Sequence, residues 1–393
     1  MTRSLSVLTL SHLYPSTVYP NLGPFVRDEV LELAKRHRIH VISPLGVPLR
    51  RPSFARRVIA SRGLSIEDEV PVTRPLILTP PLGGLRIAGP LWAHRLDRPL
   101  RHAYREMRAD LVHAHFALPD GFAASRFAQR ERAPLVLTVR GSDVLVLGRQ
   151  AGGRELLVRT LAQANAIISV SDELAKGVEE FGARPEIVEV IRGGIPYEPA
   201  LGRESARHRL GIPEEDVCIL WVGGLVPVKQ PIDAIRAFGL LDEDRLTGRK
   251  ARLVMIGDGP LRGTVADLLR RSNLEGAVQL TGYVSRRDVW AWMSAADVLV
   301  NSSSSEGTPM AVLEALGAGT PIAAYPLPGV RAVVEAVDGG VIAAGGTPQD
   351  LAAAIGAELA IARDRSRVAA AAREHFDIVR VAEAIEDVYA RVV

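Results

Sequence analysis

Two glutamates lie eight residues apart in the segment SSSSEGTPMAVLEALGAGTP, which spans residues 302–321. Glu306 stands where a run of serines meets a Gly-Thr-Pro turn, and Glu314 lies among alanines and leucines in a segment with the composition of a helix. A carboxylate flanked by Leu313 and Leu316 needs hydrogen-bond donors if it is buried, and vicinal hydroxyls of a sugar would supply two. The alternative is that Glu314 is a solvated helix position and Glu306 an ordinary capping carboxylate.

The turn between the two glutamates has the features of a helix start. Pro309 fits the first helical turn because its φ is fixed and it has no N–H to leave unsatisfied. The amides of Gly307, Thr308 and Met310 are then expected to point outward, at the positive end of the helix dipole. Amides arranged in this way bind phosphate or sugar oxygens.

A lysine follows a glycine-rich turn in VGGLVPVKQ, residues 222–230. Lys229 in this position is a natural counter-charge for a diphosphate. The alternative is that Lys229 is a solvated residue at the start of a helix.

Short β-branched runs alternate with helical patterns along nearly the whole chain, which predicts parallel α/β architecture. A segment rich in Gly and Pro, residues 193–199, separates two such series, so we expect two doubly wound domains. Ligands bind at the carboxyl ends of the strands in such sheets. The predicted strands are 6–10, 39–43, 111–115, 135–139, 166–170 and 187–191, then 218–222, 252–256, 277–280, 298–301, 321–324 and 340–343; predicted helices include 26–35, 154–163, 172–181 and 379–392.

The composition is that of a globular protein large enough for two domains. The chain has 393 residues, of which 47% are hydrophobic and 24% charged. The single cysteine, Cys218, excludes an internal disulfide, suits a reducing compartment and lies in an apolar run. The sequence holds no apolar run of transmembrane length, and the stretch Leu5–Leu10 is too short for a signal-peptide core. We therefore expect a cytoplasmic protein.

Positive charge is concentrated in the first half of the chain. Residues 1–196 hold 27 Lys or Arg and 19 Asp or Glu, a net charge of +8, whereas the remainder carries −5. Such a face suits an anionic membrane surface or an anionic substrate, and the alternative is an ordinary arginine-rich surface. No nucleic-acid-binding motif is present, so nucleic acid is not an expected partner. The arginines cluster at Arg50, Arg51, Arg56, Arg57 and Arg62, and between Arg95 and Arg108.

Several ordered strings together resemble a retaining, nucleotide-sugar-dependent glycosyltransferase of family 4, which has the GT-B fold. In the second half they are EGTPMAVLEALGAGTPIAA (306–324), VGGLVPVKQPIDAIRAF (222–238), LVMIGDGPLR (253–262) and VQLTGYVSRRDVWAWMSAADVLVNSS (278–303). In the first half they are SHLYPSTVYPNLGPFVRDEV (11–30), HAHFALPDG (113–121) and TVRGSDV (138–144). The first of these strings carries the E-x7-E motif of that family.

The resemblance implies roles for the donor-site residues. Glu314 would bind the donor ribose, Glu306 the transferred sugar, and Lys229 the diphosphate. Gly307, Thr308 and Pro309 would hold the diphosphate and sugar, Tyr283 and Val284 would line the base pocket, and Gly23 would approach the donor phosphates from the first domain. Members of the family usually have Arg or Asn where this chain has Gly224, so a cationic contact is either missing or supplied by Arg262.

The acceptor site is expected at the strand ends of the first domain. The candidates are His115, Asp120, Arg140 and Asp143. Many members have His in place of Arg140, which would favour an anionic acceptor group if it faces the acceptor and cannot act as a base. His113 shares a face with His115, and we interpret it as a core histidine.

The expected architecture is GT-B, with two Rossmann-like doubly wound domains. The two are an acceptor-binding domain (1–196) and a nucleotide-sugar-binding domain (197–376), and a C-terminal helix (377–393) is expected to pack back on the first domain. The expected reaction is retaining and metal-independent transfer from a nucleotide sugar, UDP-sugar before GDP-sugar, to a lipid-linked or polysaccharide hydroxyl. No metal is expected, because the Asp-x-Asp string Asp242-Glu-Asp244 follows a helical pattern and not a strand. No cofactor is expected either. The alternatives are a GT-B nucleotide-sugar epimerase and a non-catalytic two-lobed binding protein.

Overall fold

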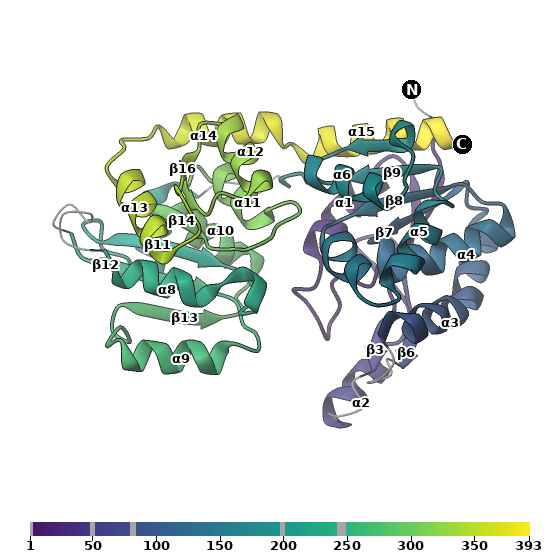
Figure 1. Cartoon of the computed structure of the whole chain (residues 1–393), viewed down its shortest axis with the longest axis horizontal. Coiled ribbons are helices and arrows are strands. Elements are labelled where there is room, and N and C mark those ends of the chain that lie inside the picture. The colour runs from purple at the N-terminus through teal and green to yellow at the C-terminus, as the bar shows by residue number, and fades with distance from the viewer. Residues whose placement is uncertain (1–2, 48–51, 79–83, 197–200, 242–248) are drawn as a thin grey trace. The chain divides into compact units, whose positions relative to one another are not determined.

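The structure is a computed structural model that describes residues 3–47, 52–78, 84–196, 201–241 and 249–393 (Figure 1). The chain forms two compact units, the first made of Met1–Gly194 and Ile378–Val393, the second of Ile195–Asp377. Each unit is an α/β sandwich with its own sheet, which confirms the predicted pair of Rossmann-like domains. Among the described helices, none is long and apolar enough to cross a membrane.

The sheet of the first unit has eight strands in the order β10-β9-β8-β7-β1-β2-β5-β4. Its central strands are fully buried and mostly apolar, with two histidines on β7, as expected when helices cover both faces. The strands are β1 (Ser6–Leu10), β2 (Arg38–Ile42), β4 (Gly63–Glu67), β5 (Val70–Arg74), β7 (Leu111–His115), β8 (Leu135–Val139), β9 (Ala166–Ser169) and β10 (Val188–Val190), and a separate pair is formed by β3 (Leu45–Val47) and β6 (Leu76–Leu78).

Alternate residues of these strands enter two separate cores. Helices α1 (Pro24–Ala34) and α15 (Ile378–Val392) cover one face, where Val7, Val41 and Leu111 are buried. The other face packs against α3 (Gly84–Met107), α4 (Phe122–Glu131), α5 (Gly153–Leu161) and α6 (Asp172–Glu180). The C-terminal helix α15 is joined to β7 by a hydrogen bond between the Tyr389 hydroxyl and His113 Nδ1 (2.7 Å).

The second unit has a six-stranded parallel sheet in the order β13-β12-β11-β14-β15-β16. One face packs against α7, α10, α11, α12 and α14, and the other against α8, α9 and α13. The strands are β11 (Val217–Val222), β12 (Ala251–Ile256), β13 (Val278–Gly282), β14 (Val298–Asn301), β15 (Ile322–Ala324) and β16 (Gly340–Ile342); the helices are α7 (Arg203–Leu210), α8 (Pro231–Gly239), α9 (Arg262–Arg271), α10 (Arg286–Ala295), α11 (Met310–Gly317), α12 (Pro328–Ala336), α13 (Pro348–Leu359) and α14 (Arg365–His375).

One part of the first sheet differs from the predicted parallel pattern. Strand β4 pairs antiparallel with β5 at the sheet edge. The turn between them places Asp68 and Glu69 in the left-handed region (φ 49° and 68°). Two successive residues with positive φ give the hairpin turn that matches strand twist, usually made with Asn-Gly. Because this chain uses two acidic residues there, the sequence carries no hairpin signal. Helix α2 (Pro52–Ala60) precedes this hairpin.

Candidate active site

The order of strands in the second unit defines the position where a ligand binds. From β11 the chain proceeds to β12 and β13 on one side, and β14 lies on the other side of β11. Strands β11 and β14 therefore flank the switch point of the sheet, where loops at the carboxyl ends lead away in opposite directions. Lys229 lies in the loop after β11, and Glu306 lies in the loop after β14.

Lys229 and Glu306 form a two-pronged ion pair at this switch point. Lys229 Nζ donates to Glu306 Oε1 and Oε2 at 2.6 and 2.8 Å. Glu306 Oε1 also accepts from Ser303 Oγ (2.6 Å) and from Asn301 Nδ2 (3.3 Å). The carboxylate side chain is 8% exposed and the lysine 31%. Glu306 is thus held in one orientation, whereas part of the lysine stays open to solvent.

The two loops that carry this pair are joined by further hydrogen bonds. Ser304 N donates to Val228 O (2.8 Å), and Ser302 Oγ lies 2.9 Å from Lys229 O. Trp221 Nε1 donates to the same hydroxyl at 3.1 Å. The serine run therefore serves to join the end of β14 to the end of β11, which fixes the backbone on both sides of the ion pair.

Helix α11 begins one residue later than the turn pattern predicts. Pro309 is the residue before the helix, with φ −78° and ψ 76°, and Met310 is the first helical residue. The Met310 amide donates to Thr308 O at 2.9 Å, so it does not point outward as predicted. The non-helical ψ of Pro309 turns that N–H back on the turn. Within α11, Glu314 is 18% exposed, and an Arg286 nitrogen lies 3.8 Å from its carboxylate.

The glycine-rich loop after β11 packs against the loop after β12. Leu225 N donates to Asp258 O (3.0 Å), and Leu261 N donates to Leu225 O (2.9 Å). A Cβ at Gly259 would lie 2.6 Å from Leu225 O, so only glycine allows this approach. At Gly224, in contrast, an added Cβ would have no neighbour closer than 3.8 Å.

Asp258 also brings together the other predicted donor-site residues. Arg262, the first residue of α9, is exposed and lies 3.4 Å from the Asp258 carboxylate. Tyr283, which follows β13, is 62% exposed, and its hydroxyl donates to Asp258 O at 3.4 Å. Val284 is half-buried beside it and packs against the core of the unit.

The first unit has a hydrogen-bonded His–Asp pair at the corresponding position of its own sheet. Strands β1 and β7 flank its switch point, because β2 lies on one side of β1 and β7 on the other. His12 follows β1 and Asp120 follows β7. The His12 ring Nδ1 makes a short hydrogen bond to Asp120 Oδ2, and His12 N donates to the same oxygen at 3.1 Å. Burial alone would lower the pKa of His12, but the Asp120 carboxylate raises it above its ordinary value.

Arg140 makes its hydrogen bonds with protein groups of its own unit, and its place in an acceptor site stays a prediction. Its guanidinium donates to Glu29 Oε1 and Oε2 (2.9 and 2.7 Å) and lies 2.8 Å from His115 Nδ1. The side chains of Arg140 and Glu29 are each 5% exposed. Burial lowers the pKa of His115 well below its ordinary value, with His113 and Arg140 adding to the effect, so His115 is neutral. Glu29 is 111 residues away in the chain, and no local signal could have paired it with Arg140.

Asp143 and His113 are also buried, and both make hydrogen bonds to protein groups. Asp143 accepts from the amides of Ala117 (2.7 Å) and Gly141 (2.8 Å). Burial raises the pKa of Asp143 although these amides act against the shift. His113 has Tyr389 OH on one ring nitrogen and Thr138 Oγ1 on the other, both at 2.7 Å, which matches its interpretation as a core histidine.

Gly23 immediately precedes α1 and closes the loop that starts at His12. Its backbone is left-handed (φ 69°), and a Cβ would lie 2.3 Å from Leu13 O. Pro24 then starts the helix with the fixed φ that suits this position. The local sequence Gly-Pro therefore places the amino end of α1 at the carboxyl edge of the sheet.

Comparison with known proteins assigns both units to one enzyme family. Residues 202–375 match the model of the glycosyl transferases group 1, and residues 23–198 match that of Glycosyltransferase Family 4. The chain belongs to the group 1 glycosyltransferases. As a member of this family it is a hexosyltransferase with the GT-B fold that uses a nucleotide-sugar donor.

Two relatives and one solved structure illustrate the similarity. TuaC of Bacillus subtilis strain 168, named for teichuronic acid biosynthesis, is 29% identical over 84% of this chain and 83% of its own. The D-inositol 3-phosphate glycosyltransferase of Streptomyces bingchenggensis strain BCW-1 is 29% identical over 72% of this chain and 66% of its own. HepE of Anabaena, solved with UDP and glucose, shares 20% identity and a TM-score of 0.73 over 98% of this glycosyltransferase and 99% of HepE.

Sequence patterns did not single out four of the residues that build these two sites. All four lie inside the quoted strings. His12 and Glu29 acquire their partners only when segments more than 100 residues apart meet, whereas Asn301 and Ser303 contact Glu306 five and three residues further along the chain. Among the residues that the structure describes, no group of three or more His, Cys, Asp or Glu side chains could hold a metal ion. The segment Asp242–Asp244, weighed as a metal motif, lies outside the described residues.

Proposed function

We propose that this glycosyltransferase transfers a hexose from a UDP-sugar, with retention and without a metal ion, to a hydroxyl of a lipid-linked or polysaccharide acceptor. GDP-sugar is the second candidate donor. The observation that carries the proposal is the Lys229–Glu306 pair at the switch point of the second sheet. It combines a partly exposed cation with an oriented carboxylate where donor ligands bind in doubly wound sheets.

The charges of the pair suit the two ends of a sugar diphosphate. An ammonium has three N–H donors, so Lys229 can keep its contacts to Glu306 and still donate to a phosphate oxygen. The fixed Glu306 carboxylate accepts hydrogen bonds from sugar hydroxyls. Glu314 lies within α11, the helix that follows the Glu306 loop, and its side chain is 18% exposed. It accepts hydrogen bonds from the ribose hydroxyls. Tyr283 and Val284 contact the base, while Gly224, Gly307, Thr308, Pro309 and Arg262 line the diphosphate end.

The chemical step is leaving-group departure assisted by fixed charge. The bond between the anomeric carbon and the diphosphate oxygen breaks, and its electron pair leaves with the diphosphate. Lys229 and the amides of the glycine-rich loops stabilise that charge. The acceptor hydroxyl attacks from the face that the diphosphate leaves, so the anomeric configuration is retained.

UDP is favoured because the solved structure of HepE contains UDP and glucose. A polysaccharide or lipid-linked acceptor is favoured because TuaC is named for teichuronic acid biosynthesis. We also propose a cytoplasmic location with a peripheral position on the inner membrane face. The patch that supports it consists of Arg56, Arg57 and Arg62, all exposed, with Ile59 (37% exposed) and Leu64 (65%) beside them. Arg50 and Arg51 lie outside the described residues.

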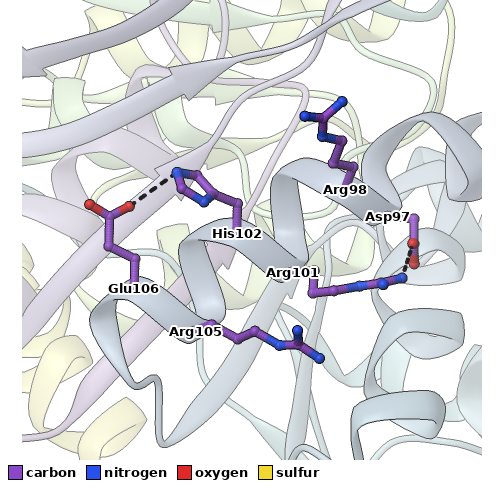
Figure 2. A pocket seen from close by; sticks show the side chains of 6 residues that line it. All are labelled: Asp97, Arg98, Arg101, His102, Arg105 and Glu106. Carbon is purple, nitrogen blue, oxygen red and sulfur yellow. Dashed lines mark hydrogen bonds and ion pairs between the residues drawn. The ribbon is translucent and has the colours of Figure 1, made fainter.

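The arginine-rich face of α3 contributes less to this surface than the sequence indicates. Figure 2 shows Asp97, Arg98, Arg101, His102, Arg105 and Glu106 along one side of the helix, with Arg101 directed at Asp97 and His102 at Glu106. Arg101 and Arg105 also lie 3.7 and 3.3 Å from Glu131. Much of the charge of this face is therefore neutralised within the unit.

A donor screen tests the proposal. We expect UDP-glucose to raise the melting temperature more than GDP- or ADP-glucose, because a ligand that binds only the folded state stabilises it by mass action. Release of UDP from UDP-glucose should continue in the presence of a chelator. A larger rise of the melting temperature with GDP- or ADP-glucose would identify that sugar nucleotide, and not UDP-glucose, as the donor. Loss of turnover on chelation would contradict the metal-independent step.

A further inference from the structure

The pairing of His12 with Asp120 in the first unit is not explained by packing alone. Asp120 is fully buried, and within the described part of the chain its Oδ1 atom has no hydrogen-bond partner. Its other oxygen holds both the ring Nδ1 and the backbone N–H of His12. A buried carboxylate with one unpaired oxygen costs free energy, and such costs are typical of functional sites.

The His12 ring is fixed in orientation but is open at one end. Its ring lies 5.3 Å from that of Phe116 and 5.8 Å, edge-on, from that of Trp92 (centroid distances). The side chain nevertheless remains 27% exposed. Since Nδ1 is bonded to Asp120, Nε2 is the ring nitrogen left for an external partner. His12 follows β1, so this atom lies at the carboxyl edge of the sheet, beside the switch point.

The carboxylate determines which nitrogen of His12 carries the proton. When Asp120 accepts from Nδ1–H, the neutral imidazole keeps its lone pair on Nε2, the arrangement found in Asp-His pairs that accept a proton from a hydroxyl. Two carboxylates act on the ring, Asp120 and Asp143, and together they raise the pKa of His12 against the effect of burial. A histidine within hydrogen-bond reach of a hydroxyl can accept its proton in the transition state.

The other titratable candidates of the first unit do not offer this chemistry. His113 and His115 are each 1% exposed and Asp143 is fully buried. Arg140 cannot act as a base. His12 is therefore the group among them that a substrate could touch.

We propose that His12 is a catalytic residue that binds the acceptor hydroxyl, with Asp120 as its positioning residue. This inference rests on the proposed transfer reaction. The hydroxyl oxygen forms the new bond to the anomeric carbon as the bond to the diphosphate breaks. The hydroxyl proton moves to His12 Nε2, and Asp120 stabilises the imidazolium until the proton passes to water.

Two amide variants separate this role from a structural one. His12→Asn places an amide where Nδ1 contacts Asp120, whereas His12→Gln places one near Nε2. The assay is UDP release from UDP-glucose with water or octyl β-D-glucoside as acceptor, measured over a range of pH. We expect wild-type kcat/KM to rise with pH through a pKa above 6.5, because the base must be neutral. Both variants should lose this limb and about 100-fold or more of the rate, while the exposed control His102→Asn keeps both.

Each outcome supports or contradicts the proposed role of His12. A His12→Asn enzyme with the wild-type rate would show that the ring only holds the loop, and a wild-type rate that falls with rising pH would show that His12 binds an anion as a cation. Loss of the UDP-glucose melting shift in both variants would place His12 in donor binding. If the wild type itself shows neither a shift nor UDP release, the proposed function fails. NMR of the His12 ring then still tests the pair: a pKa below 6.5 or a proton on Nε2 in the neutral form would overturn it.

Discussion

Lys229 and Glu306, 77 residues apart in the chain, meet through two hydrogen bonds of 2.6 and 2.8 Å at the switch point of the second sheet. His12 and Asp120, 108 residues apart, meet at the switch point of the first. In both sheets a partly exposed basic side chain, lysine or histidine, is paired with a buried carboxylate from the loop of the neighbouring strand. Parallel α/β topology produces this arrangement, because strands distant in sequence become neighbours at the switch point.

The empty space beside Gly224 predicts a gain of donor affinity. Gly224→Arg should change the free energy of unfolding by less than about 0.5 kcal/mol, since an added Cβ meets nothing closer than 3.8 Å. A guanidinium at the diphosphate loop should tighten UDP-glucose binding roughly tenfold, as measured by calorimetry. Gly259→Ala is the contrasting variant, because its Cβ would lie 2.6 Å from Leu225 O and should destabilise the unit. Unchanged donor affinity in Gly224→Arg would place the diphosphate elsewhere.

The strand positions could largely be predicted from the sequence, because buried parallel strands are continuous apolar runs. The predicted ranges 111–115, 135–139 and 298–301 coincide with β7, β8 and β14. The β4–β5 hairpin could not, since its turn uses Asp68 and Glu69 at positive φ. Contacts between residues that are distant in the sequence could not be predicted either, because they form only when the strands assemble into a sheet.

Arg140 shows the same limit for the candidate site. Its type and position give no indication that its guanidinium pairs with Glu29 on α1. A chain position identifies the edge of the sheet where a residue lies, whereas the direction of its side chain depends on which helix packs there.

The buried Arg140–Glu29 pair predicts a large stability effect. Arg140→Met should lower the free energy of unfolding by about 3–5 kcal/mol, because Glu29 is left charged and unpaired. Replacing both residues, as in Arg140→Met with Glu29→Leu, should recover much of that loss. Urea unfolding provides the measurement, with Arg331→Ala as control, since the exposed Arg331–Glu335 pair should contribute about 0.3–0.5 kcal/mol. An additive double variant would exclude coupling between the two side chains.

The core histidine predicts a loss of stability in acid. Burial, with a smaller effect from Arg140, lowers the pKa of His113 to about 3 from 6.5. The unfolded chain therefore binds a proton that the folded chain excludes. Stability should be constant in this respect above pH 6.5 and fall below it by up to about 1.4 kcal/mol per pH unit. In His113→Gln this slope should be smaller, whatever the stability at neutral pH. An identical slope in both proteins would assign the acid sensitivity to other groups.

The basic patch of α2 and β4 predicts binding to anionic vesicles. Each arginine near an anionic surface contributes about 1 kcal/mol, so replacing Arg56, Arg57 and Arg62 by Ala should weaken binding roughly 100-fold. Co-sedimentation with phosphatidylglycerol vesicles at low and high salt measures the effect. The matched control replaces Arg270, Arg271 and Arg331 in the second unit. Equal binding of both triple variants, or no wild-type binding at low salt, would exclude this patch as a membrane contact.

The most direct test of the account is turnover by variants of the central pair. Lys229→Met and Glu306→Gln keep the approximate side-chain volumes, and Glu306 keeps the Ser303 and Asn301 donors without Lys229. Both proteins should therefore fold, Lys229→Met with a lower melting temperature than the wild type because the Glu306 carboxylate loses its cation. UDP release from UDP-glucose should fall by about 100-fold or more in each, while Lys250→Ala, an exposed lysine of the same unit, should retain the wild-type rate. Full activity in Lys229→Met and in Glu306→Gln would contradict the assignment of this pair as the catalytic centre of the donor site.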